Sequence, residues 1–169
     1  RRAVVSGLRR VDEDLWGRAE PYLYLGSLDE GNAEFQKECA SFLEEAEITP
    51  SPKFFPTLLE LLTCHSGAIR ALAGIAVVDL LTQLADTLAE KHDAMIGSVL
   101  TQVVTIYSET DCMFNKLSCA KCFVKFAKLT KTEEQITLLF HFLLQNALAK
   151  PLFLDADAEP LRDELFSAG

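Results

Sequence analysis

The side chains with the richest chemistry in this chain are its five cysteines, Cys39, Cys64, Cys112, Cys119 and Cys122. Cys119 and Cys122 form a CxxC pair, the spacing of zinc knuckles and of dithiol redox motifs. A structural zinc site takes four ligands, however, and the sequence holds no second CxxC pair. On a helical wheel Cys112, Cys119 and Cys122 share one apolar face with Phe123 and Phe126. We therefore expect these cysteines to pack in the core, with a metal or redox site as the alternative, and we predict no metal ligands and no cofactor.

The dipeptide Cys64–His65 combines a nucleophile with a base. A productive pair also needs a group that orients the base and an oxyanion hole, and adjacent residues on a helix point about 100° apart. A histidine that interacts with the last carbonyls of a helix is the simpler interpretation of His65. The sequence also lacks a nucleophile elbow, a phosphate-binding glycine loop and an HExxH motif, so we predict that the protein is not an enzyme.

Three lysines, Lys121, Lys125 and Lys128, recur at i, i+4 and i+7, the spacing that lines one face of a helix. They form a basic stripe, opposite the cysteine face, in a chain whose net charge is −9. Charge runs of this kind are commonly solvated helix faces. The alternative hypothesis is that the stripe, together with Arg70, lines a groove that receives an acidic amphipathic segment of another protein.

The C-terminal section of the chain has the composition of such a ligand. Residues 151–169 carry five acids against a single base, Arg162. A short helix predicted over Glu159–Phe166 places three apolar residues on one side, Leu161, Leu165 and Phe166. We expect this tail to dock in the groove in cis, or to resemble the segment that binds there in trans.

The net charge also bears on partners and location. It disfavours nucleic-acid binding, because phosphate contacts need clustered lysine and arginine. The odd number of cysteines and the lack of a signal peptide favour a reducing compartment, the cytoplasm or the nucleus. The longest uncharged runs, Ala94–Ser108 and Gln135–Ala149, fall short of the roughly 20 apolar residues that a membrane span needs, so we predict buried helices and no membrane span.

Apolar residues recur every three or four positions through most of the chain, which predicts helices. The expected helices span residues 33–46, 54–65, 68–90, 93–108, 112–129 and 130–150. A capping box of Thr130 and Glu133 is expected to begin the last of them. Gly17, Pro21 and Gly26 interrupt the helical spacing of the first thirty residues, so we expect a short helix there followed by an irregular segment.

The segment Thr49-Pro50-Ser51-Pro52 breaks this series, because proline cannot donate a backbone hydrogen bond and restrains the residue before it. We predict a single α-helical domain over residues 1–169. It consists of N-terminal helices (1–48), a main stack of helices (53–150) and an acidic C-terminal tail with a short helix (151–169).

A weak internal period accompanies the helices. A shift of 48 positions lays Ile69 on Leu117 and Leu72 on Ala120, and helix-pair units of this size are typical of stacked helical repeats. The segment Ser66–Leu81 resembles the second helix of a HEAT or armadillo repeat, and the resemblance extends over about residues 54–148. It implies an all-α fold, a short α-solenoid of stacked antiparallel helix pairs. A non-repetitive helical bundle is the alternative.

These patterns favour a non-enzymatic protein-interaction or scaffold module that binds a partner segment in a helical groove. Its expected partner-binding residues are Arg70, Lys121, Lys125 and Lys128. One alternative is a homodimerising helical regulator with an aromatic patch of Trp16, Tyr22 and Tyr24 at its interface. Another is a helical bundle that binds a metal ion or a small molecule.

Overall fold

A computed structural model describes residues 13–147 of the chain. Every regular element within this range is a helix, and none of these residues lies in a strand, so the all-α prediction is confirmed. The α-helices are α2 (Glu13–Ser27), α3 (Ala33–Glu45), α4 (Phe55–Glu60), α5 (Gly67–Gln83), α6 (Ala85–Leu88), α7 (His92–Glu109), α8 (Met113–Phe126) and α9 (Glu133–Ala147). Short 3-10 helices join them: η1 (Glu30–Asn32), η2 (Pro52–Phe54), η3 (Leu61–Thr63) and η4 (Ala89–Lys91).

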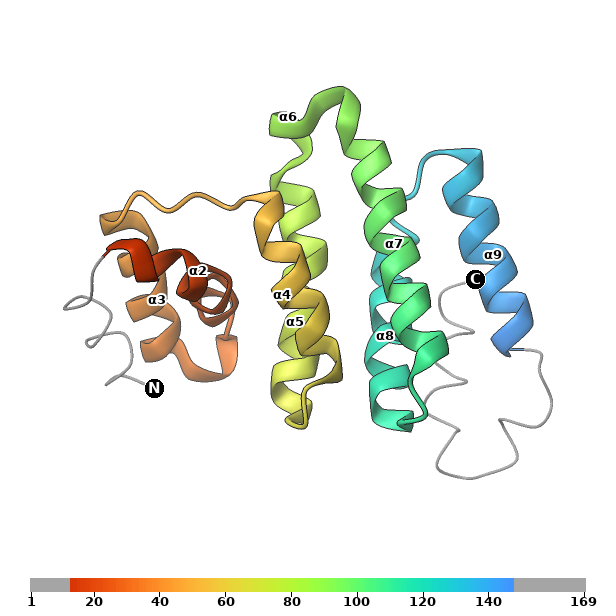
Figure 1. Cartoon of the computed structure of the whole chain (residues 1–169), viewed down its shortest axis with the longest axis horizontal. Helices are drawn as coiled ribbons and strands as arrows, with labels where there is room; N and C mark the ends of the chain where they lie inside the picture. Colours follow the sequence, from red (N-terminus) through yellow and green to blue (C-terminus); the bar gives the residue numbers. More distant parts are fainter. Residues whose placement is uncertain (1–12, 148–169) are drawn as a thin grey trace.

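Consecutive helices pack as antiparallel pairs arranged side by side (Figure 1). α2 packs on α3, α4 on α5, and α7 on α8. The α4–α5 pair lies beside the α7–α8 pair, so that α5 contacts α8 and α4 contacts α7, while α9 packs on α7. The segment before η2 crosses from α3 to this stack without helical structure, as the two prolines predicted.

Small residues let α5 and α8 approach each other closely. A Cβ atom added to Gly74 would lie 3.0 Å from the Cys122 sulfur, so a larger residue at this position would force the helices apart. The Cys122 thiol donates a long hydrogen bond of 3.9 Å to the Gly74 carbonyl oxygen. Ala73 and Ala76 on α5 and Ala120 on α8 are fully buried, as this close packing requires.

The structure corrects the prediction for the first thirty residues. Gly17, Pro21 and Gly26 all lie inside α2, which continues as a helix to Ser27. Proline costs roughly 3 kcal/mol in a helix interior, and tertiary packing regularly outweighs such a propensity. Here Leu23 and Tyr24, which follow the proline, are buried against the rest of the fold.

Two contacts fix α2 in place. The Tyr24 hydroxyl donates a hydrogen bond of 2.7 Å to the Asp79 carboxylate on α5, and its ring packs against Phe54. Gly26 faces α3, because a Cβ atom there would lie 2.6 Å from the Cys39 sulfur. The glycine that was expected to interrupt the helix therefore allows α2 to contact α3.

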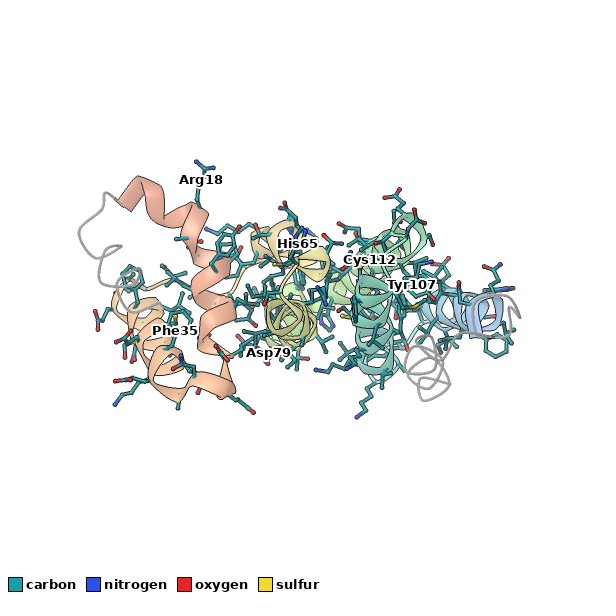
Figure 2. All side chains as sticks on the ribbon, turned by 90° about the horizontal axis from the view of Figure 1, so that it is seen from below. Arg18, Phe35, His65, Asp79, Tyr107 and Cys112 are labelled. Carbon is teal, nitrogen blue, oxygen red and sulfur yellow. The ribbon has the colours of Figure 1, made fainter. Side chains whose placement is uncertain are left out.

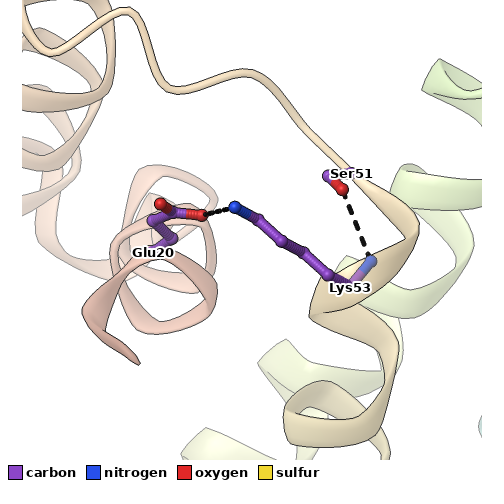
Figure 3. Close-up of polar contacts among 3 residues, drawn as sticks. All are labelled: Glu20, Ser51 and Lys53. Carbon is purple, nitrogen blue, oxygen red and sulfur yellow. Dashed lines mark hydrogen bonds and ion pairs between the residues drawn. The ribbon is translucent and has the colours of Figure 1, made fainter. Parts of the chain in front are cut away.

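An ion pair joins α2 to the start of the main stack (Figure 3). The Lys53 ammonium lies 2.6 Å from the Glu20 carboxylate, whose side chain is largely buried. The Ser51 hydroxyl accepts a hydrogen bond of 3.4 Å from the Lys53 amide at the start of η2. The linker thus ends at a capped turn that also carries the cation for this contact.

The expected helix over residues 68–90 is divided. α5 ends at Gln83, and α6 and η4 follow it before α7 begins. The segments Gly67–Gln83 and Ala85–Glu109, on the two sides of Leu84, are bent by 50°, and Ala89 within the second segment adopts a positive φ of 42°. His92 stabilises the bend from a buried position, because its Nε2 atom lies 2.7 Å from the Leu81 carbonyl oxygen and must donate to it.

The capping box of α9 is also displaced from the predicted one. The Thr132 hydroxyl, and not that of Thr130, accepts a hydrogen bond from the third amide of the helix, that of Gln135, at 3.3 Å. The Gln135 side-chain oxygen accepts in return from the Thr132 amide at 3.4 Å. Gln135 is buried and donates to the Asp93 carbonyl oxygen at 2.6 Å, so the same residue also attaches α9 to α7, which Glu133 cannot do from its exposed position.

Candidate partner-binding groove

A groove with a volume of about 310 Å³ lies between α5 and α8. Its walls alternate small, apolar and basic side chains. The lining residues are Gly67, Arg70, Ala71, Gly74 and Ile75 on α5, and Phe114, Leu117, Ser118, Lys121 and Lys125 on α8.

Small residues of α5 form the hollow, and larger apolar residues stand at its edges. Gly67, Ala71 and Gly74 recur at helical spacing and carry little or no side chain, so the surface is recessed along this line. Phe114 is 68% exposed and Ile75 is 42% exposed, which are high values for residues of this size. The groove therefore offers apolar surface that no described part of the chain covers.

The charge of the groove is of one sign. Three lining residues are basic, Arg70, Lys121 and Lys125, and none of the lining residues is acidic. Neither lysine forms an ion pair with an acid in residues 17–146. In a chain with a net charge of −9, this is a local positive surface that can attract carboxylates.

Arg70 is held in position by the backbone that precedes α5. One guanidinium nitrogen, Nη1, donates hydrogen bonds to the Cys64 carbonyl oxygen at 2.6 Å and to the His65 carbonyl oxygen at 3.1 Å. The guanidinium also lies 5.7 Å from the centre of the Phe114 ring on α8. Arg70 thus satisfies carbonyls at the end of η3 and joins the two walls of the groove.

The structure separates the four residues that the sequence grouped. Arg70, Lys121 and Lys125 line the groove together, whereas Lys128 does not. α8 ends at Phe126, so the i+7 spacing no longer keeps Lys128 on the face of its two neighbours. Leu161, Leu165 and Phe166, the expected tail-docking residues, lie outside the described residues.

The cysteines divide between core and surface. Cys119 and Cys122 are fully buried, as expected from the apolar face of the helical wheel. Cys112 is exposed, so its placement in the core was wrong. It precedes Met113, the first residue of α8, and the periodicity of the helix does not apply to it. Within the described residues, no group of three or more His, Cys, Asp or Glu side chains is placed to hold a metal ion.

A second cavity, of about 420 Å³, adjoins the groove at Arg70 and Phe114. Cys64, His65 and Cys112 line it, and Figure 2 shows His65 and Cys112 close to each other. Sequence spacing gave no sign that Cys112 lies near Cys64. The backbone carbonyls of Cys64 and His65 both accept hydrogen bonds from Arg70, which fixes the backbone of this dipeptide at the edge of the cavity.

Tyr22 and Tyr24, two of the three residues of the expected aromatic patch, do not share a surface. Tyr24 is buried and bonded to Asp79, whereas Tyr22 on the same helix is about half exposed. The side chain of Trp16 lies outside the described part of the structure. The two tyrosines are two positions apart on α2 and therefore point in different directions.

The burial of cysteine thiols and of a tyrosine hydroxyl predicts that alkaline pH destabilises the fold. Burial, with a smaller contribution from Glu38, raises the pKa of Cys39 to about 11. Burial likewise raises the pKa of Cys122 and of Tyr107 to about 12. The folded chain keeps these protons to a higher pH than the unfolded chain, so this stability is fully present below pH 9.0, the ordinary thiol value, and is lost as the pH rises through 11 and 12.

Urea unfolding at a series of pH values measures this effect. We expect the free energy of unfolding to fall steadily above pH 9.0, and to fall equally in Cys112→Ala, because Cys112 is exposed. In Cys39→Ala the slope should be smaller. A free energy of unfolding that stays constant through pH 11 would show that these groups titrate normally.

No single helix in the described part of the chain is long and apolar enough to cross a membrane, although Gly67–Gln83 and Ala85–Glu109, bent by 50°, pass the same criteria of length and composition together.

Comparison with known proteins adds no relative. No family model, curated protein or solved structure matches this chain. A proposal for the function therefore rests on the residues that line the groove.

Proposed function

We propose that this protein is a non-enzymatic interaction module that binds an acidic amphipathic segment of a partner protein in the groove between α5 and α8. The observation that carries the proposal is the combination of three cations and uncovered apolar side chains in one groove with no acid among its lining residues. An amphipathic helix that enters a groove places its apolar side chains on the floor and its charges at the rim.

The dimensions and position of the groove agree with such a ligand. Lys121 and Lys125 are one helical turn apart, so they match acids spaced at i and i+4 on a bound helix. Phe114 on α8 and Ile75 on α5 line the two walls and offer exposed apolar surface to the apolar side chains of a bound helix. Arg70 is already fixed by its bonds to the backbone, which lowers the entropy cost of its pairing with a carboxylate.

The arrangement of the helices supports a related proposal for the fold, a short α-solenoid similar to HEAT and armadillo repeats. The pairs α4–α5 and α7–α8 lie side by side with first helix against first helix and second against second. Gly74 and Cys122, which the 48-residue period makes equivalent, are hydrogen-bonded neighbours. Stacked repeats bring equivalent positions together in this way, and they use one surface of the stack for recognition. We place the module in the cytoplasm or the nucleus.

A labelled peptide of defined chemistry tests the proposed function. The peptide carries leucines at i and i+4 and glutamates on its remaining positions, and a control peptide has every glutamate replaced by glutamine. Fluorescence anisotropy should show binding of the acidic peptide to the full chain, about tenfold weaker binding of the control, and a loss of the difference at high salt. Equal affinity for both peptides, or no binding of either, would contradict the proposal.

A further inference from the structure

The last described helix, α9, has no second helix paired with it among the described residues, unlike α4 and α7. In the stack, α5 follows and pairs with α4, and α8 follows and pairs with α7. α9 packs on α7 from outside, as α7 packs on α4, so α9 occupies the position of a first helix. Its pairing helix is expected from the residues that come next in the chain.

α9 leaves an apolar stripe uncovered. Ile136, Phe140 and Leu144 are 52%, 58% and 40% exposed, and they recur at i, i+4 and i+8, so they share one side of the helix. Leu139 and Phe142 are buried on the side that faces the core. Three large apolar residues exposed in register are unusual for a surface that only meets water.

The chain after α9 contains a segment that matches this stripe. Leu161 and Leu165 have the same i, i+4 spacing, and Phe166 extends the apolar side. The 48-residue period carries Met113 onto Leu161 and Leu117 onto Leu165, and Met113 and Leu117 pack against the core from the second helix of their pair, α8.

The connection is long enough. Leu161 lies fourteen positions after Ala147, and an extended chain over that many steps spans about 46 Å. α9 has 15 residues and is about 22 Å long, so the segment can return along any part of it.

We infer that residues 159–166 form the second helix of this pair, pack on Ile136, Phe140 and Leu144, and leave the groove between α5 and α8 free for a partner. The competing placement is the groove, because Asp155, Asp157 and Glu159 are complementary to its lysines. The order of the chain favours α9, since every other pair in the stack joins consecutive helices. The inference concerns a separate surface and does not depend on the proposed function.

Hydrogen exchange of the full chain, measured by mass spectrometry without any ligand, tests this placement. We expect amides 161–166 to be protected at least tenfold relative to an unfolded peptide. Phe140→Asp should abolish that protection, and Lys125→Glu should preserve it. Protection of the α7 and α8 amides reports whether each variant remains folded. If Phe140→Asp lowers that protection, Leu144→Asp is used in its place, and it must remove the protection of amides 161–166 alone.

Any one of four outcomes would overturn the inference. The first is that the amides of residues 161–166 exchange at the unfolded rate in the unaltered chain. The second is that Leu144→Asp and Phe140→Asp both leave these amides protected. The third is that Lys125→Glu removes the protection of these amides, which would place the tail in the groove. The fourth is that the protection of the α9 amides rises with protein concentration while light scattering detects a dimer. A second copy of the chain would then cover the apolar stripe of α9.

Discussion

Reversal of both groove lysines, Lys121→Glu with Lys125→Glu, is expected to weaken binding of the acidic amphipathic peptide about thirtyfold, or about 2 kcal/mol. Each reversal removes an attraction worth up to about 1 kcal/mol at a partly exposed site and adds a repulsion of similar size. Lys125 is half-buried in the groove lining and should contribute more than Lys121, which is exposed. Anisotropy titration at low salt measures the change.

Lys128→Glu is the matched control for this prediction. It makes the same change of charge as each single reversal, two positions beyond the end of α8, at a residue that does not line the groove. We expect less than a threefold effect from it, and thermal unfolding of all the variants should agree with that of the unaltered chain. If Lys128→Glu weakens binding as strongly as Lys125→Glu, the peptide responds to the net charge of the protein and the groove has no specific role.

Phe123→Ala is expected to lower the free energy of unfolding by about 3–5 kcal/mol, the largest effect on stability predicted for this chain. Phe123 has no exposed surface. Its ring centroid lies 4.4 Å from that of Phe142 and 6.2 Å from that of Tyr107, so one side chain joins α8 to both α9 and α7. Its removal leaves a cavity where the three helices meet, and urea unfolding measures the loss.

Phe114→Ala, on the same helix, is the control: it should weaken peptide binding and leave stability almost unchanged. Phe114 is exposed, so its truncation should change the free energy of unfolding by less than about 0.5 kcal/mol. It should nevertheless weaken peptide binding several-fold, because the ring forms one wall of the groove and contacts Arg70. Similar losses of stability in the two variants would mean that Phe114 belongs to the core and that the groove is not an open surface.

Helical periodicity was sufficient to predict which segments are helices but not where they bend. The apolar pattern of residues 68–90 continues past Gln83, and the end of α5 depends on a tertiary contact, the bond from His92 to the Leu81 carbonyl. Pro21 was given too much weight as a helix breaker, since burial of the residues that follow it keeps α2 helical. The capping box of α9 depends in the same way on the contact of Gln135 with α7.

The candidate groove could be anticipated only in part. Lys121 and Lys125 lie one turn apart on a single helix, and that local spacing is visible in the sequence. Their meeting with Arg70 depends on the packing of α5 on α8, for which the sequence signal was the weak 48-residue period. Phe114 and Ile75 were missed as groove residues, because an apolar residue on a helix is by default assigned to the core.

A nuclear magnetic resonance titration of the ¹⁵N-labelled full chain with the acidic peptide tests the central claim most directly. We predict that shifted backbone amides cluster at Ala71, Ile75, Ser118, Lys121 and Lys125, which line the groove, and that amides on the exposed side of α9 remain unshifted. Shifts that appear on α9, or that scatter over lysines outside the groove such as Lys128 and Lys131, would contradict a binding site between α5 and α8.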